Sequence, residues 1–351
     1  MVPSLRPGLP VRNVLVVGTG SIGMRHLRNL VALGAQVQVF RYRVDGDALP
    51  DGVRQVDDIA AAMAGPCDAV VVANRTDLHL AVAQQAADAG KALFIEKPLA
   101  ATLERVNLLQ RTVVSQGLVV ETGFMLRCHP NLRWLRTHLT AGGLGAVHHV
   151  RAAVGQYLPD WRPGTDHRTS YSARPAWGGG VVFDLIHELD LVAWLCGSVQ
   201  DVTAMTRHVS ALDIGTEAIA QIGLRLEGGI LAQVHLDYVR PGYGRAMEIV
   251  GERGVLTWDY TAGTVHLLTD DGQQQLVHRV PDGFVRNALF LDHMAHFLAR
   301  LDTPGLAPVS SLDDAVAALR VAVACHRSAA DGRHVRPSDL TPTFQPLQRQ
   351  L

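Results

Sequence analysis

The sequence lacks several features that would place it in a large class of proteins at once. No apolar run approaches the ~18 residues that a membrane-spanning helix needs. The four cysteines, Cys67, Cys128, Cys196 and Cys325, lie far apart without a CxxC pair or a metal-ligand spacing, so we expect reduced, buried thiols. Lys and Arg total 32 against 33 for Asp and Glu, which gives no general attraction to nucleic acid or to an anionic membrane.

What the sequence does contain is enough apolar material for buried cores. Hydrophobic residues make up 48% and charged residues 19% of the 351 positions. This composition suits a globular protein, and the length suits two domains at roughly 150 residues each. The stretch 1–13 carries prolines and arginines but no apolar segment of the kind found in signal peptides, so we expect a cytoplasmic protein.

In the first part of the chain, strand and helix patterns alternate. Short apolar runs typical of strands buried on both faces of a sheet occur at 14–17, 37–40, 69–73 and 92–95. Helical patterns occur between them at 22–33, 57–63 and 78–89. This alternation predicts an α/β domain with a doubly wound parallel sheet, which we place at residues 1–126.

Beyond that point the strand patterns follow one another without helices between them. They occur at 199–209, 217–226, 229–238, 245–250, 254–259 and 264–268, after an earlier strand at 147–154. Helices are expected at 131–139, 184–195, 285–300 and 312–330, and a long loop at 157–177. The pattern predicts an α+β domain at 127–351, with a mainly antiparallel sheet. Two arrangements are compatible with the sequence: the last helices stay within this domain, or they pack back on the first domain.

A glycine-rich loop directly after the first predicted strand points to a dinucleotide. The loop consists of Gly18, Thr19, Gly20, Ser21, Ile22 and Gly23. In a GxGxxG loop the first glycine allows a tight turn, the second lets the backbone approach a pyrophosphate, and the third permits close helix packing. The helix N-terminus that follows attracts the anion. These six residues predict a Rossmann domain that binds NAD(P), with a methyltransferase-type nucleoside site as the alternative.

The residues after the second predicted strand favour NADP over NAD. NAD-selective sites place an Asp or Glu about 20 residues beyond the glycine loop, where it binds the ribose hydroxyls. Here Arg41, Tyr42 and Arg43 occupy that place, and no acid does. Arg41 and Arg43 would pair with the 2′-phosphate of NADP. The alternative is that both arginines are solvated loop residues.

A lysine follows the strand at 92–95, at the carboxyl edge where open α/β sheets bind ligands. It belongs to the sequence Glu96-Lys97-Pro98. An ammonium group at that edge needs water or a partner, and the proline restricts Lys97 to an extended backbone. Lys97 is therefore a candidate catalytic residue, with an ordinary surface lysine as the alternative.

A second group of polar residues follows the triple glycine at 178–180. Asp184 and His187 are three residues apart, which on one helix turns both side chains toward one site. A histidine near a carboxylate and an ammonium can accept and donate protons near neutral pH. Two alternatives stay open: Asp184 as an N-cap in a capping box with His187 or Glu188, and a metal site of His187, Glu188 and Asp190.

Together these motifs resemble the glucose–fructose oxidoreductase / inositol dehydrogenase / MocA (Gfo/Idh/MocA) family. The segments that carry the resemblance are GTGSIGMRHL, AVVVANRTDLHL, EKPLA, GGGVVFDLIHELDLVAWLCG, GERGVLTWDY and SLDDAVAALRVAVACHRSA. They cover nearly the whole chain. The resemblance implies an NAD(P)-dependent oxidoreductase that acts on a secondary alcohol or ketone of a sugar, cyclitol or nucleotide-linked sugar. It also implies that the domain at 127–351 binds the substrate and forms a homo-oligomer, a dimer or a tetramer.

The resemblance assigns roles to the candidate residues. Lys97 holds the substrate oxygen, His187 removes the hydroxyl proton as the hydride leaves, and Asp184 orients the substrate. Many members of the family place the aspartate four residues before the histidine, whereas the gap here is three, and Asn74 follows the third strand where a proline is usual. Further expected cofactor contacts are Ala73, Asn74, His79, Glu96 and Lys97.

The loop at 157–177 resembles a subgroup linked to the sugars of surface polysaccharides. The expected substrate contacts are Arg127, Trp161, Arg162 and Tyr171, in addition to Asp184 and His187, with Asp160 and Arg168 as further candidates. The alternatives are a loop that packs for its own stability and an ordinary ion pair for Arg127. The rival functions are a non-catalytic dinucleotide-binding regulator, which needs neither Lys97 nor His187, and a transferase.

Overall fold

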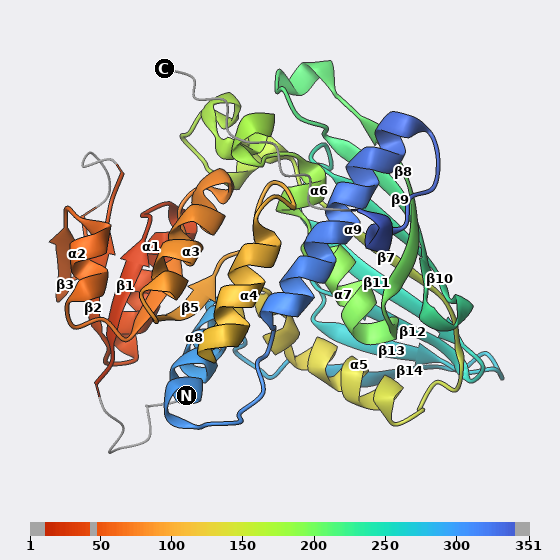
Figure 1. Cartoon of the computed structure of the whole chain (residues 1–351). Helices are drawn as coiled ribbons and strands as arrows, with labels where there is room; N and C mark the ends of the chain where they lie inside the picture. The colour runs from red at the N-terminus through yellow and green to blue at the C-terminus, as the bar shows by residue number, and fades with distance from the viewer. Residues whose placement is uncertain (1–10, 43–47, 341–351) are drawn as a thin grey trace.

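The computed structural model describes residues 11–42 and 48–340, and within them the chain forms two sheets (Figure 1). Six strands make a parallel sheet in the order β3-β2-β1-β4-β5-β6, which is the order of doubly wound dinucleotide-binding domains. Eight strands make the second sheet in the order β14-β13-β12-β11-β7-β10-β9-β8. There β7 and β10 run parallel, and the other neighbours are antiparallel. The predicted fold class is confirmed.

The first sheet is buried on both faces because helices cover each of them. Its strands are β1 (Asn13–Val17), β2 (Gln36–Phe40), β3 (Val53–Val56), β4 (Ala69–Val72), β5 (Ala92–Ile95) and β6 (Val120–Thr122). Its helices are α1 (Ser21–Ala32), α2 (Ile59–Ala64), α3 (His79–Asp88) and α4 (Val106–Gln116). Alternate residues of β1 therefore enter different cores: Leu15 packs with residues of α2, α3 and α4, and Val14 packs with residues of α1.

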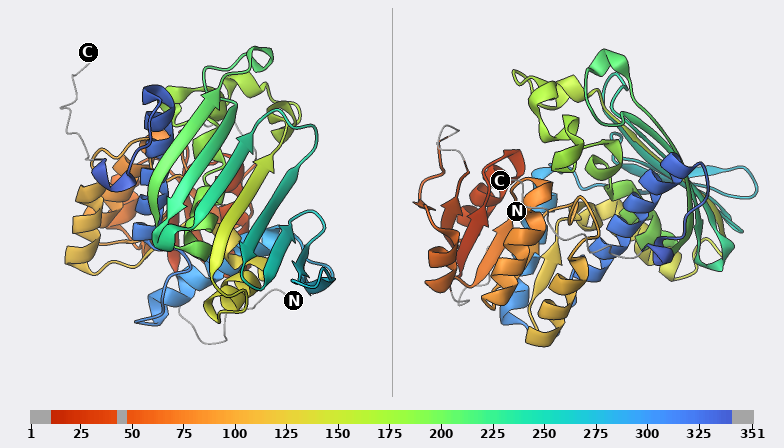
Figure 2. Two further views of the ribbon diagram at one scale, coloured as in Figure 1. Left: turned by 90° about the vertical axis from the view of Figure 1, so that its right-hand side faces the viewer. Right: turned by 45° about the horizontal axis from the view of Figure 1, so that its top comes forward.

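The second sheet has helices on one face. Its strands are β7 (Val147–Gly155), β8 (Val199–Arg207), β9 (Ile219–Leu226), β10 (Leu231–Asp237), β11 (Gly244–Gly251), β12 (Gly254–Asp259), β13 (Thr264–Leu268) and β14 (Gln274–Arg279). The helices that follow or precede them are α5 (Pro130–Thr140), α6 (Val181–Asp184), α7 (His187–Cys196), α8 (Asn287–Asp302) and α9 (Leu312–Asp331). The left view of Figure 2 looks onto the opposite face, where the described residues lay no helix over the strands.

Helix α8 returns to the first sheet. Its residues Met294 and Phe297 share a core with β1, β2 and α1, and the ring of Phe297 lies edge-on to Phe94 of β5 at 5.6 Å. Helix α9 lies along β8 and also contacts α4 and β6. The two helices therefore connect the second sheet to the first, in agreement with the possibility left open by the sequence.

The structure corrects the helix expected at 184–195. Two helices occupy the segment, α6 and α7, and Leu185 and Ile186 separate them. The N-caps are Gly180 and Ile186, so the reading of Asp184 as an N-cap is wrong. The loop at 157–177 contains four short 3₁₀ turns, η3 (Leu158–Trp161), η4 (His167–Thr169), η5 (Tyr171–Ala173) and η6 (Pro175–Trp177).

The structure also shows whether any helix could span a membrane and in what state the cysteines are. Within residues 11–42 and 48–340, no helix is long and apolar enough to cross a membrane. All four cysteines are free thiols, and three of them are buried. Burial raises the pKa of Cys128 to about 12, so this thiol stays protonated at neutral pH.

Candidate active site

The glycine loop joins β1 to α1 and has the shape of a cradle for an anion. Gly18 has a φ of 109°, and a Cβ there would lie 2.6 Å from the carbonyl oxygen of Ala73. A Cβ on Gly23 would lie 2.2 Å from the carbonyl oxygen of Gly18, whereas one on Gly20 would meet no described atom within 4 Å. The first and third glycines are thus required by packing, and the second faces open space. This fits a pyrophosphate placed at the N-terminus of α1.

The three other residues of the glycine loop differ in how far their side chains are exposed. Ser21 is exposed and Thr19 is half-buried, while Ile22 packs against both cores of the first domain. Only Ile22 therefore has a clear structural task, and Thr19 and Ser21 keep side chains near the surface of the cradle.

The carboxyl ends of β2 and β4 lie next to this cradle. Tyr42, exposed after β2, accepts a hydrogen bond at its hydroxyl from Nδ2 of Asn74 at 3.1 Å. The Oδ1 atom of Asn74 is buried and has no hydrogen-bond partner among the described residues, so it offers an acceptor to a ligand. Arg41 is half-buried directly after β2, and Arg43 lies outside the described residues.

Two predicted cofactor contacts are used inside the protein. Oε1 of Glu96 lies 2.6 Å from Nε2 of His26 in α1, and Oε2 accepts the N–H of Lys97 at 3.1 Å. The ring nitrogens of His79 lie 2.9 Å from the carbonyl oxygen of Pro98 and 3.1 Å from that of Asn74. Glu96 and His79 therefore hold the turns after β4 and β5 in place, which leaves neither a free ring nitrogen nor a free carboxylate oxygen.

Lys97 connects the two domains. The Lys97–Pro98 peptide bond is cis, and Nζ of Lys97 donates a hydrogen bond to the carbonyl oxygen of Asp184 at 2.6 Å. Burial lowers the pKa of Lys97, and the carboxylates of Asp184 and Glu96 oppose that shift. The predicted pair of Lys97 and Asp184 is thus brought together, through a backbone oxygen.

The Asp184 carboxylate is held by a tyrosine from the second sheet. Its Oδ2 accepts a hydrogen bond from the hydroxyl of Tyr238 at 2.6 Å, and its Oδ1 is buried without a partner in the described part of the chain. Burial and the nearby carboxylate raise the pKa of Tyr238 well above its ordinary value, so the phenol remains a donor. The indole of Trp161 meets the Tyr238 ring edge-on at 5.3 Å. Trp161 therefore supports Asp184 through Tyr238.

His187 begins α7 beside this cluster and is 5% exposed. Its Nδ1 is buried without a hydrogen-bond partner among residues 11–42 and 48–340, and its ring meets Phe124 edge-on at 5.6 Å. Burial, followed by the positive charges of Lys97 and Arg245, lowers the pKa of His187 well below its ordinary value. The imidazole is therefore neutral at pH 7 and able to accept a proton.

The carboxylates that follow His187 both face arginines. Glu188 binds Arg245 of β11, with 2.6 Å between Oε1 and Nε. Asp190 binds Arg127, with 2.6 Å between Oδ1 and Nη2, and Arg127 also lies 3.1 Å from Asp314. Both carboxylates are therefore bound by arginines. Arg127 forms the ion pair that was its alternative, and its guanidinium is occupied.

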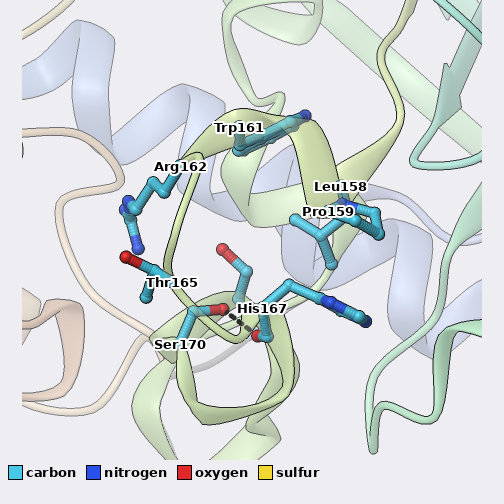
Figure 3. A pocket seen from close by; sticks show the side chains of 8 residues that line it. Leu158, Pro159, Trp161, Arg162, Thr165, His167 and Ser170 are labelled. Carbon is cyan, nitrogen blue, oxygen red and sulfur yellow. Dashed lines mark hydrogen bonds between the residues drawn. The ribbon is translucent and has the colours of Figure 1, made fainter.

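Part of the loop at 157–177 lines a small hollow that is open to solvent (Figure 3). Its lining consists of Leu158, Pro159, Trp161, Arg162, Thr165, His167, Ser170 and Ser172. The guanidinium of Arg162 lies 5.4 Å from the ring centre of Tyr171, whose pKa is raised by burial and by Asp184. The indole nitrogen of Trp161 donates to the carbonyl oxygen of Gln156 at 3.2 Å. Asp160 and Arg168 are exposed, and Arg168 pairs with Asp166 at 2.9 Å.

Sequence reasoning missed the contribution of the second sheet. Tyr238 follows β10, and Tyr243 and Arg245 stand at the beginning of β11. The parallel pairing of β7 with β10 brings these positions to one end of the sheet, against the N-terminus of α7. The segment DYVRPGYGR has the aromatic and basic residues of a binding site, but its position becomes apparent only once the strand order is known.

Comparisons with known proteins agree with this arrangement. Residues 12–124 match the family described as "Oxidoreductase family, NAD-binding Rossmann fold", and residues 132–257 match the GFO/IDH/MocA C-terminal domain. An inositol 2-dehydrogenase of Burkholderia cenocepacia is 30% identical over 265 residues, 68% of this chain and 72% of that protein. An inositol 2-dehydrogenase/D-chiro-inositol 3-dehydrogenase of Lacticaseibacillus casei is 29% identical over 261 residues, 70% of this chain and 72% of that protein.

A solved structure agrees over nearly the full length. GenD2 from gentamicin A biosynthesis, in complex with NAD, superimposes with a TM-score of 0.81 at 26% identity, covering 96% of this chain and 99% of that one. The similarity therefore extends across both domains.

An open glycine cradle on one domain and a half-buried lysine tied to the other define a nicotinamide-dependent oxidoreductase. More particularly, the chain belongs to the Gfo/Idh/MocA family. Membership confirms the predictions of the family, of an enzyme that acts on CH–OH groups, and of a nicotinamide cofactor.

Proposed function

We propose that the protein interconverts a secondary alcohol and a ketone on a sugar or cyclitol, with NAD(P) as the hydride carrier. The observation that carries this proposal is the cluster of Lys97, Asp184 and His187, in which Asp184 Oδ1 and His187 Nδ1 are buried without partners in the described chain. Open acceptor positions of this kind suit a polyhydroxylated ligand. The names of the relatives, inositol dehydrogenases among them, support the same substrate class.

The roles follow from the charge states. A bound nicotinamide supplies the hydride acceptor. Neutral His187 takes the proton of the reacting hydroxyl, because its lowered pKa keeps it unprotonated. The Lys97 ammonium, fixed on the carbonyl oxygen of Asp184, stabilises the negative charge that develops on the substrate oxygen. The free oxygen of the Asp184 carboxylate accepts a neighbouring substrate hydroxyl and so fixes its orientation.

We further propose that NADP is preferred to NAD. The support is the sequence after β2, where Arg41 and Arg43 stand and the usual acid is missing. The test is a calorimetric titration of cofactor-free protein with NADPH, NADH and S-adenosylmethionine, on the native chain and on Arg41→Ser. We expect tighter binding of NADPH and a loss of that preference in the variant. Equal or tighter binding of NADH would reject the preference while leaving the enzyme class intact.

The reaction itself is tested by following nicotinamide absorbance with a panel of cyclitols, aldoses and nucleotide-linked sugars. Turnover of at least one of them is expected. Tight NAD(P) binding without turnover of any would favour the non-catalytic regulator, because that function needs the glycine cradle alone.

We also propose a homo-oligomer formed through the uncovered face of the second sheet. Arg151, Ala153, Gln221, Gln233 and Ala246 are exposed there, on four neighbouring strands. Light scattering of the purified protein should give a dimer or tetramer, and a charge placed at Ala246 (Ala246→Glu) should reduce the mass. A monomer at all concentrations would contradict the proposal.

A further inference from the structure

Arg245 presents a fixed positive group whose charge acts on both Lys97 and His187. The residue stands at the beginning of β11 and is 6% exposed. Its Nε and Nη2 atoms bind the two oxygens of Glu188 at 2.6 and 3.2 Å. The third nitrogen, Nη1, makes no hydrogen bond to any residue of the described chain. Since arginine remains charged and Glu188 holds it on one side, the remaining N–H groups are oriented before any ligand arrives.

A second donor lies beside this arginine. The ring centre of Tyr243 is 5.8 Å from the guanidinium carbon of Arg245, and its hydroxyl is buried without a partner among the described residues. Burial raises the pKa of Tyr243 to about 12, so the hydroxyl keeps its proton at neutral pH. The ring of Tyr260, at 6.0 Å, lies near the same guanidinium. The site therefore has two adjacent donors that the protein leaves unused.

The chemistry of these donors selects a ligand group. Arginine can only donate hydrogen bonds, and the unused hydroxyl of Tyr243 can donate a second. A sugar hydroxyl carries one oxygen and a proton of its own, whereas a carboxylate carries two oxygens and accepts only. The carboxylates of Asp184 and Glu188 offset the positive charges of Lys97 and Arg245, so the donors, and not a net charge, select the ligand group. A carboxylate accepts hydrogen bonds from both donors.

We propose that the substrate is a polyhydroxy acid, a sugar acid or cyclitol acid, whose carboxylate binds Arg245 Nη1 and the Tyr243 hydroxyl. This inference rests on the proposed function, since it places the acid group of the substrate whose hydroxyl reacts at His187 and Lys97. Arg245 and Tyr243 are then the residues that distinguish acids from neutral polyols.

The test compares matched pairs of substrates that differ in the acid group. Glucuronate against glucose and galacturonate against galactose are assayed with NAD⁺ and NADP⁺. We expect kcat/KM to be at least about tenfold higher for the acid, since hydrogen bonds to a charged group are the stronger ones. In Tyr243→Phe the acid-to-neutral ratio should fall about tenfold, while Tyr157→Phe, at an exposed tyrosine, should keep the native ratio.

A second variant protects the test against misfolding. Arg245→Gln alone leaves Glu188 buried without its cation, so it is combined with Glu188→Gln, which restores a neutral pair. The double variant should retain a cooperative melting transition and lose the preference for acids. A variant ratio equal to that of the native protein would overturn the inference.

The outcomes separate this inference from the proposed reaction. Turnover of neutral sugars at or above the rate for acids would overturn the inference and leave the oxidoreductase in place. If neither class of substrate turns over, the melting temperature of the NADH-bound protein is measured with gluconate and with sorbitol, to show whether the acid binds. Stabilisation by gluconate that Tyr243→Phe removes would support the acid site without the reaction, and the absence of any shift would overturn it.

Discussion

At the scale of single residues, the active site leaves buried polar atoms unsatisfied. Asp184 and His187 are 3% and 5% exposed, yet each has one side-chain atom without a hydrogen-bond partner in the described chain. A buried polar group in this state costs about 1–3 kcal/mol of stability. Other buried side-chain atoms in the described chain are also unpaired, such as Nε1 of Trp258 and Nε2 of His138. We propose that substrate hydroxyls complete the hydrogen bonds of the Asp184 and His187 atoms.

The glycine loop allows a prediction that separates folding from cofactor binding. In Gly20→Ala the new methyl meets no described atom within 4 Å, so the melting temperature should stay close to the native value. The same methyl intrudes on the pyrophosphate and should weaken NAD(P) binding at least tenfold. In Gly23→Ala the methyl would lie 2.2 Å from the Gly18 carbonyl oxygen, and the protein itself should be destabilised.

The measurements are thermal melting and cofactor titration of both variants. Native cofactor affinity in Gly20→Ala, or native stability in Gly23→Ala, would contradict the assigned roles of the two glycines.

The sequence predicted the chemistry residues better than their surroundings. Lys97 binds the carbonyl oxygen of Asp184, and His187 begins the next helix, so the motifs lie near one another although Asp184 and His187 do not share one helix. Glu96 and His79, expected at the cofactor, bind partners from other elements instead. Such pairing depends on residues that are distant in the chain, such as His26 and Glu96, 70 positions apart, and spacing carries no signal for it.

At the scale of elements, strands and helices with a strong pattern of apolar residues were predicted, and those with a weak pattern were missed. The buried strands β1 and β4 were predicted within a residue of their bounds. The strands β3, β6 and β14 and the helix α4 were missed. VRQV and QQLVHR contain no buried residue, β6 is only three residues long, and α4 buries only Val106 and Leu109. The break between α6 and α7 was missed because Leu185 and Ile186 are apolar and buried, as they would be in a continuous helix.

The N-terminus of α5 predicts a pH dependence of stability. Nδ1 of His129 caps this helix by accepting the N–H of Asn131 at 3.2 Å. Burial, with the charges of Arg245 and His278, lowers the pKa of His129 to about 4 from 6.5. The unfolded chain therefore binds the proton first, and stability is full above pH 6.5 and falls as the pH drops toward 4. The loss over this window is on the order of 3 kcal/mol.

Urea unfolding at pH 7 and pH 5 measures this effect. His129→Asn keeps a capping acceptor that does not titrate, so its stability should fall less between the two pH values. Three other buried histidines with lowered pKa values, His79, His187 and His293, leave some pH dependence of stability in the variant. Identical losses in the native protein and His129→Asn would exclude His129 as a source.

At the scale of the whole molecule, the chain crosses between its two sheets more than once. The proposed boundary at residue 126 separates the sheets, but α8 places Met294 and Phe297 in the core of the first. The hydrogen bond from Lys97 to Asp184 adds a polar link between the first domain and the later chain. The catalytic cluster therefore depends on how firmly α8 and α9 fix one sheet against the other.

A fragment of residues 1–126 should consequently fail to fold as a stable domain. Without α8 it exposes the apolar face of β1 and β2 that Met294 and Phe297 cover. In the full chain, Phe297→Ala should cost roughly 3–5 kcal/mol, because the ring is fully buried. Calorimetry of the fragment should show no cooperative transition, and a native-like melt with dinucleotide affinity would contradict this account.

The most direct test of the catalytic account is the turnover of Lys97→Ala and His187→Ala, measured with the best substrate of the panel alongside their affinity for NAD(P). The account predicts that each variant loses turnover by about a hundredfold or more. Cofactor affinity should stay within about tenfold of the native value, because neither side chain is assigned to the phosphates. Native turnover in either variant would contradict the proposed roles of Lys97 and His187.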